Sequence, residues 1–212
     1  MEPLENIKKL FSRNFVESPL LETYEAGTLH LPTGELVACD PLITSDMKPF
    51  TRRLKAGDYP VLIHREIESS CVAYIELVCQ ETPVVDWELG LTAGQDPKDL
   101  APGEIFGFPV QSGMAAYMDS DTQEELSLLE QKLYKRKGVD FMGIYEEFFH
   151  EEFFDENGAI DQFALLTPNP EKKGQVFAFE AGYGEGFYAS YFGLDSSGEI
   201  VKVITEFIEV GS

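Results

Sequence analysis

The stretch that decides the fold runs from Gln175 to Val210 and reads QVFAFEAGYGEGFYASYFGLDSSGEIVKVITEFIEV. It is rich in aromatic and β-branched residues, which favour strands, and two clusters of Gly, Asp and Ser interrupt it. We predict three antiparallel strands joined by two turns, which together form the centre of a sheet.

The first cluster has glycine at every second position from Gly182 to Gly186. A dinucleotide-binding fingerprint has similar spacing, but it requires a helix directly after the glycines. Here Phe187 and Tyr188 predict a strand, so we assign the glycines to a tight or bulged connection that needs positive φ. A second interpretation stays open, in which this Gly-rich rim, with Tyr183, Tyr188 and Glu185, borders a ligand or partner surface.

Length and composition are those of one folded domain. The chain has 212 residues, of which 43% are apolar, and this is enough for one substantial core without disulfides or metal. Its apolar runs are shorter than the ~20 residues of a membrane-spanning helix. The first residues, MEPLENIKKLF, carry acids where a secretory signal has a basic region and then an apolar one. We therefore expect a cytoplasmic protein without a membrane partner.

Cysteine and histidine are too scattered to predict a metal site. Cys39, Cys71 and Cys79 include no Cys-x-x-Cys pair, and they lie in apolar, strand-like segments, as is typical of free thiols in a reducing compartment. The three histidines are far apart along the chain. We predict no metal and no cofactor.

Negative charge is the most unusual global property. The chain has 38 Asp and Glu against 16 Lys and Arg, a formal net charge of -22. Such a field repels phosphate, so we expect neither nucleic acid nor an anionic membrane as a partner. The same field would attract a basic protein, although an acidic surface also serves solubility alone.

The order of the segments predicts an α+β fold. We expect a single domain, mainly antiparallel β-sheet, sandwich-like or strongly curved, with two or three packed helices. The expected parts are an N-terminal helix at residues 4–14, a β-rich part at 28–119, a helical segment at 121–154 and a C-terminal β-meander at 162–210. Within the helical segment, Ser120 or Asp121 caps a first helix that Gly138 ends, and Asp140 caps a second.

Familiar catalytic and metal-binding motifs fail on their spacing. Four residues after His150 stands Phe154, which excludes the His-Glu-x-x-His motif. The turns that begin at Asp155 and Asp195 resemble calcium loops but lack the bidentate acid at the last ligand position, so we interpret both as hairpin turns. No Gly-x-Ser-x-Gly elbow occurs. We predict no catalytic residue.

Arg52 is the most suggestive of the sparse cations, because an arginine before the turn at Gly57 could clamp a carboxylate or phosphate ligand in a bidentate manner. The alternative, which we favour, is a structural ion pair with an internal acid such as Asp40 or Asp119.

Six blocks in chain order resemble the bacterial family known as domain of unknown function 4241. They are PTGELVACDPLI (32–43), FTRRLKAGDYPV (50–61), VAYIEL (72–77), WELG (87–90), FGFPVQSGMAAYMD (106–119) and GYGEGFYASYFGLDSSGEIVKVITEF (182–207). In the family the middle block reads Val-Asp-Ala-Gly-Thr-Gly, whereas here Gln111 replaces the acid and Ala115 the second glycine. The resemblance implies no established activity. It marks as candidate binding positions Asp40, Arg52, Gly113, Asp119, Gly184, Gly186, Tyr188 and Asp195.

Two functional hypotheses follow. The first is a non-catalytic interaction protein that neutralises a basic protein partner such as a toxin, based on the charge balance. The second is a small-molecule enzyme or sensor, with a pocket where Arg52, Asp119 and the segment from Gly182 to Gly186 meet.

Overall fold

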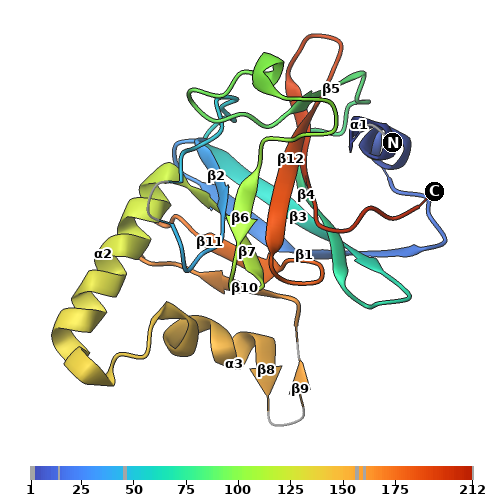
Figure 1. Cartoon of the computed structure of the whole chain (residues 1–212). Coiled ribbons are helices and arrows are strands. Elements are labelled where there is room, and N and C mark those ends of the chain that lie inside the picture. Colours follow the sequence, from blue (N-terminus) through green and yellow to red (C-terminus); the bar gives the residue numbers. More distant parts are fainter. Residues whose placement is uncertain (1–2, 14, 45–46, 156–157, 160, 212) are drawn as a thin grey trace.

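The computed structural model describes residues 3–13, 15–44, 47–155, 158–159 and 161–211 (Figure 1). The chain forms one α+β domain whose layers, in order, are helix α1, a larger sheet, a smaller sheet, and helix α2 with a shorter helical segment, Tyr145–Phe153, after it. Within the described residues, the larger sheet has seven strands and the smaller sheet four, and all their pairings are antiparallel. The predicted fold class is confirmed.

The larger sheet has the strand order β1-β3-β4-β13-β12-β5, and β6 pairs with the first part of β12. Its strands are β1 (Leu21–Leu31), β3 (Gly57–Glu66), β4 (Val72–Val78), β5 (Asp86–Leu89), β6 (Phe108–Val110), β12 (Gly186–Leu194) and β13 (Ile200–Glu206). The central strands β4 and β13 are buried on both faces, because α1 covers one face and the smaller sheet covers the other.

The smaller sheet has the strand order β10-β11-β7-β2, with β10 at one edge. Its strands are β2 (Leu36–Cys39), β7 (Met114–Asp119), β10 (Phe163–Leu166) and β11 (Val176–Glu180). Side chains alternate between its two faces, as the pleat of a strand requires. Tyr117, Phe177 and Phe179 face the larger sheet, whereas Ala116 and Ala178 face the helices.

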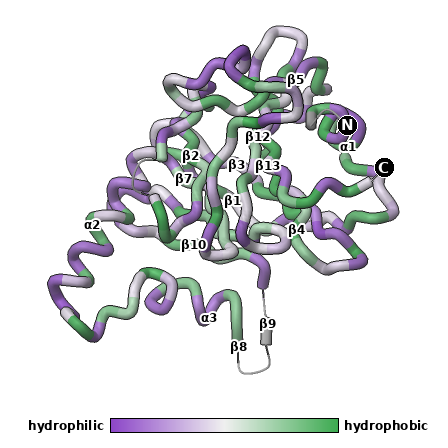
Figure 2. The backbone as a smooth tube through the Cα atoms, viewed as in Figure 1, coloured by the Kyte–Doolittle hydropathy of each residue, from purple (hydrophilic) through white to green (hydrophobic). Residues whose placement is uncertain are grey.

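The longest helices are α1 (Pro3–Phe11) and α2 (Ser120–Lys137). After α2 come a 3-10 turn (Gly138–Asp140), the π-helical turn η3 (Tyr145–Phe149), α3 (His150–Phe153) and the short hairpin of β8 (Phe154–Asp155) and β9 (Gly158–Ala159). A further 3-10 turn, Pro97–Asp99, precedes β6. Figure 2 shows hydrophobic and hydrophilic residues alternating along α2, whose Leu126 and Leu133 are buried.

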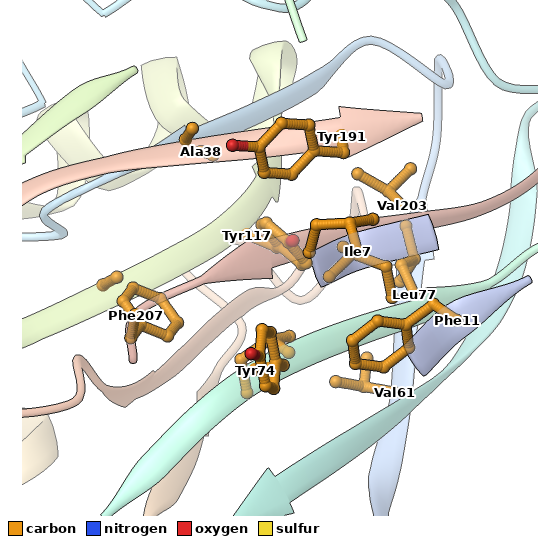
Figure 3. Close-up of a cluster of buried hydrophobic side chains, with 14 of the residues drawn as sticks. Ile7, Phe11, Ala38, Val61, Tyr74, Leu77, Tyr117, Tyr191, Val203 and Phe207 are labelled. Atoms are coloured by element: carbon orange, nitrogen blue, oxygen red, sulfur yellow. The ribbon is translucent and has the colours of Figure 1, made fainter. Parts of the chain in front are cut away.

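The main core lies between the two sheets and extends under α1. Figure 3 shows part of it, with Ile7 and Phe11 from α1, Tyr74 from β4 and Tyr117 from β7. The Tyr117 hydroxyl lies 2.6 Å from the hydroxyl of Thr205 on β13, so a hydrogen bond links the two sheets inside an apolar core. A second apolar cluster lies between the smaller sheet, α2 and the helical segment.

The three C-terminal strands are present, but the predicted pairing is wrong at one connection. β12 and β13 form the expected hairpin, whereas β11 pairs with β7 and β10 in the smaller sheet. The Gly-rich connection from Gly182 to Gly186 therefore crosses from one sheet to the other. No helix follows it, which agrees with a geometric role for the glycines and not a phosphate-binding one.

Three predicted boundaries also need correction. β1 begins at Leu21, seven residues before the predicted β-rich part at 28. The first turn of α2 is capped by the carboxylate of Asp119, just before the predicted caps, and the helix ends at Gly138 as expected. The second predicted helix starts only at Tyr145, because Gly143 has a φ of 105°, which a right-handed helix excludes. Of the predicted N-terminal helix, Asn14 lies outside the described residues.

Candidate functional site

Two buried carboxylates lie at opposite ends of the paired strands β2 and β7. Asp40 follows β2 and accepts hydrogen bonds from the amides of Gln111 (2.9 Å) and Ser112 (2.8 Å), in the turn before β7. It also accepts from the Ser112 hydroxyl and the Leu42 amide, both at 2.9 Å. Because only 1% of Asp40 is exposed, its carboxylate fixes this turn and does not face a ligand.

Asp119 repeats the arrangement at the other end of the same strand pair. It ends β7 and accepts from the Thr33 amide and hydroxyl, both at 2.8 Å, and from the Gly34 amide at 3.0 Å, in the turn before β2. A fourth bond, 3.1 Å from the Asp121 amide, caps α2. Asp119 is fully buried, so both aspartates act as structural clamps between β2 and β7.

Arg52 forms the structural ion pair that we favoured, but with an acid that the sequence analysis did not name as its partner. Its Nε and Nη2 donate to the two carboxylate oxygens of Glu88 at 2.8 and 2.7 Å. The arginine borders a cleft of about 400 Å³ that also contains Arg53 and Lys55. Each of these cations faces an acid, since Arg53 pairs with Glu35 at 3.1 Å and Lys55 lies 3.8 Å from Glu199.

The second functional hypothesis required three segments to converge, and the structure separates them. Arg52 borders a cleft closed by Gly198 and Ile200, in the β12–β13 hairpin. Asp119 is buried under the turn before β2, and Gly182 and Gly184 line a different cleft. The pocket predicted from these three segments is therefore not formed by the part of the chain that the structure describes.

Gly113 and Gly184, by contrast, come together from distant parts of the sequence. The Gly113 carbonyl accepts a hydrogen bond from the Ala181 amide at 3.0 Å, and a Cβ on Gly113 would lie 3.9 Å from the Gly184 Cα. Both glycines have positive φ, 82° and 107°. This conformation and the close backbone contact explain why glycine occupies both positions.

Tyr188 fixes the crossing between the sheets. Its hydroxyl donates to the carbonyl oxygens of Gly184 (2.9 Å) and Ala181 (3.3 Å), and its ring packs edge-on against Phe207, with centroids 4.8 Å apart. A Cβ on Gly186 would lie 2.6 Å from the Tyr188 Cζ, so the close approach requires glycine there. The candidate positions Gly186 and Tyr188 therefore stabilise the conformation of the Gly-rich connection.

Asp195 lies at the other end of β12, in the hairpin turn. It accepts from the Ser197 hydroxyl (2.7 Å), the Ser197 amide (2.8 Å) and the Glu199 amide (3.0 Å). The Ser197 hydroxyl and these amides lower the pKa of Asp195 below its ordinary value. The predicted hairpin turn is confirmed, and Asp195 is not part of the Gly113 and Gly184 site.

The two glycines line a cleft of about 560 Å³, which we call the aromatic cleft. Its remaining lining residues are mostly aromatic and apolar, and they include one carboxylate and no basic side chain: Cys71, Ser112, Met114, Tyr145, Phe153, Phe154, Glu180, Gly182 and Tyr183. Gly113, Gly184 and Tyr183 could be named from the sequence, whereas the aromatic rings of residues 145–154 could not, because nothing local indicates that these residues reach the loop.

Two polar residues of the aromatic cleft, Glu180 and Tyr183, are held in place by hydrogen bonds to side chains outside it. Glu180 Oε2 accepts from Gln162 Nε2 at 2.8 Å. The Tyr183 hydroxyl donates to Glu66 Oε2 at 3.2 Å, although 72% of Tyr183 is exposed. Partial burial and the nearby Glu66 charge raise the pKa of Tyr183, so its hydroxyl stays protonated and can donate.

A smaller acidic groove of about 210 Å³ lies on the other side of the helical segment, against β10. It is lined by Glu146, Glu147, Phe148, Glu151, Glu152, Leu165 and Leu166. Glu147 pairs with Lys137 Nζ at 2.5 Å. Among the described residues, the other three glutamates form no ion pair, so the groove keeps a net negative charge.

Buried titratable side chains also lie under α1, on the outer face of the larger sheet. Glu76 lies 2.9 Å from His64 Nε2 and 2.6 Å from Lys202 Nζ, and all three are at most 4% exposed. Burial opposes ionisation of Glu76, but His64 and Lys202 outweigh it and lower its pKa. Charged residues inside the apolar runs VAYIELV and IVKVITE were the sequence signal for this cluster, which the sequence analysis missed.

Within the described residues, no group of three or more His, Cys, Asp or Glu is placed to hold a metal ion. Also within them, no helix has the length and apolar character needed to cross a membrane.

Comparison with known proteins gives one match. The family model described as Protein of unknown function (DUF4241) matches residues 29–205. No curated protein and no solved structure matches the chain.

Proposed function

The chain belongs to the DUF4241 family of proteins of unknown function, and from that premise we propose that it is a non-catalytic binding protein for a basic protein partner. The proposal rests on one observation. The helical segment Tyr145–Phe153, with the adjoining Phe154 of β8, carries glutamates into the acidic groove on one side and aromatic rings into the aromatic cleft on the other.

The acidic groove combines charge with an apolar floor. Glu146, Glu151 and Glu152 are exposed, while Leu165 and Leu166 of strand β10 contribute apolar lining. A basic chain segment could place its charged ends near the glutamates and its aliphatic stems on the leucines. Because β10 is an edge strand, no further strand of the smaller sheet pairs with its outer side among the described residues, and edge strands are sites where an added chain can pair.

Net charge supports the same partner at long range. A formal charge of -22 accelerates the encounter with a basic protein and slows that with an acidic one. The buried carboxylates Asp40 and Asp119 contribute to the fold instead, because backbone amides and hydroxyls occupy their acceptor sites. The groove glutamates Glu146, Glu151 and Glu152, by contrast, are exposed and accessible to a partner.

The proposal predicts salt-sensitive binding of a basic peptide. The probe is a fluorescein-labelled peptide of alternating arginine and glycine, titrated with the protein and followed by anisotropy at low and at high salt. We expect saturable binding at low salt that weakens steeply as salt is added. No binding of this probe at low salt, where electrostatic attraction is strongest, would overturn the proposed function.

Paired variants separate the groove from bulk charge. The triple variant E146Q/E151Q/E152Q removes three groove charges, and E68Q/E130Q/E171Q removes three from exposed positions outside the groove. We expect the groove variant to bind the probe peptide roughly tenfold or more weakly than the wild type, and the control variant to change this affinity by less than about threefold. Equal losses in the two variants would refute the assignment to the groove.

We also propose a reducing compartment, the cytoplasm, for this protein. Cys39, Cys71 and Cys79 are free in the structure. Labelling of all three thiols in protein denatured directly from cells would agree, whereas recovery of any of them as a disulfide would contradict it.

A further inference from the structure

The aromatic cleft has a floor of bare backbone. A Cβ on Gly184 would meet no atom within 4 Å, so the space above this glycine is open to the cleft. Gly182 differs, because a Cβ there would lie 2.9 Å from the Phe207 Cβ. The floor at Gly113 and Gly184 therefore carries no side chain, which leaves room for a flat group to approach the backbone closely.

Aromatic rings from three elements line the cleft. Tyr145 comes from the helical segment, Phe154 from β8 and Tyr183 from the Gly-rich loop. His150 lies between the first two, with ring centroids 5.8 Å from Tyr145 and 6.2 Å from Phe154. The negative faces of aromatic rings attract cations, most strongly where water is partly excluded.

The polar lining favours a cation as well. Glu180 is the only carboxylate that lines the cleft among the described residues, and no Lys, Arg or His lines it there. Gln162 occupies its Oε2 at 2.8 Å, which orients the carboxylate. An anion placed here would meet Glu180 and the ring faces without a compensating charge.

A guanidinium group fits these features better than an ammonium group. It is planar, stacks on rings and peptide planes, and donates in parallel to a carboxylate. An ammonium group is a compact, strongly hydrated charge that gains little from a flat slot. We propose that the aromatic cleft seats an arginine side chain of the basic partner, with its guanidinium on Glu180; this inference rests on the proposed function.

The test compares three peptides that differ at one central residue. The peptides carry arginine, lysine or citrulline in a Gly-Ser background with the same flanking arginines, and citrulline keeps the planar shape without the charge. We expect the arginine peptide to bind roughly tenfold more tightly than the other two. Equal affinity for arginine and lysine would refute the inference.

Matched variants locate the contact. E180Q removes the carboxylate inside the cleft, at the end of β11, whereas E185Q removes an exposed carboxylate that lies in the following Gly-rich loop and does not line the cleft. E180Q should lower the affinity for the arginine peptide about tenfold and leave the affinity for the citrulline peptide unchanged. E185Q should change neither affinity by more than about twofold. Y183A, at a largely exposed ring, should reduce the preference for arginine without unfolding the chain.

The outcomes separate this inference from the function on which it rests. Equal weakening by E180Q and E185Q, with basic peptides still bound, would overturn the arginine seat and leave the basic-partner proposal standing. Absence of binding by every basic peptide at low salt would overturn both. Circular dichroism of each variant checks that the loss does not come from unfolding.

Discussion

Replacing Asp119 with alanine tests the clamp between β2 and β7. The carboxylate accepts four hydrogen bonds at 2.8 to 3.1 Å, from the Thr33 amide and hydroxyl and from the Gly34 and Asp121 amides. Asp119 is fully buried, so water cannot readily replace it. The substitution leaves buried donors without an acceptor and removes the N-cap of α2.

The expected loss follows from these bonds. A hydrogen bond to a charged group contributes about 1.5–3 kcal/mol, and loss of an N-cap costs about 1 kcal/mol. Neighbouring bonds are not additive, so we expect D119A to lower the free energy of unfolding by about 3–5 kcal/mol. In urea, with a slope of about 2–3 kcal/mol per molar for a chain of this size, the midpoint should fall by about 1–2.5 M.

Urea unfolding followed by circular dichroism measures the effect, and D119N and D99A are the comparisons. D119N keeps one acceptor oxygen but places an NH₂ group toward backbone donors. Its free energy of unfolding should therefore lie between those of D119A and the wild type. Asp99 is exposed, so D99A should stay within about 0.5 kcal/mol of the wild type. A loss below about 1 kcal/mol for D119A, or an equal loss for D99A, would refute the clamp.

Three further predictions concern the fold. G182A should cost more stability than G198A in urea unfolding, because both residues have positive φ but only at Gly182 would the Cβ contact Phe207, at 2.9 Å; equal losses would contradict this. Burial raises the pKa of Glu206 from its ordinary 4.5 to about 7, so the folded state favours the protonated carboxyl. The resulting contribution to the free energy of unfolding is fully present below pH about 4.5 and is lost as the pH rises through 7. Relative to E206Q, the wild type should therefore lose roughly 2–3 kcal/mol between pH 4.5 and 8; a constant difference would be inconsistent with that shift. K202M should lower the free energy of unfolding by about 3–5 kcal/mol, because it leaves Glu76 buried without its ammonium partner, and a loss below about 1 kcal/mol would contradict this.

Local patterns were sufficient for the elements of the fold but not for all of their pairings. Alternating side chains and the turn at Asp195 predict the β12–β13 hairpin, which depends on residues close in sequence. The connection from Gly182 to Gly186 has a length that suits either a hairpin or a crossing between sheets. Which of the two it forms depends on the pairing of β11 with β7. These strands are distant in sequence, so no local pattern predicts that they pair.

The candidate site could be predicted only in part, because its residues meet through contacts between segments that are distant in sequence. Glycines with special backbone geometry are visible in a sequence, so Gly113 and Gly184 could be named, but their contact could not. Tyr145 was assigned to a helix without a partner, since its place in the aromatic cleft depends on how the helical segment packs. Arg52 was expected to form an ion pair, yet its partner Glu88 follows from the position of β5 beside β12.

The most direct test of the binding proposal is an NMR titration of the isotopically labelled protein with the arginine peptide at low salt. The account predicts that amide shifts concentrate at Gly113, Gly184 and the segment Tyr145–Phe154, and that E180Q diminishes them. Shifts confined to the cleft of Arg52 and Lys55, or spread evenly over the surface, would contradict it.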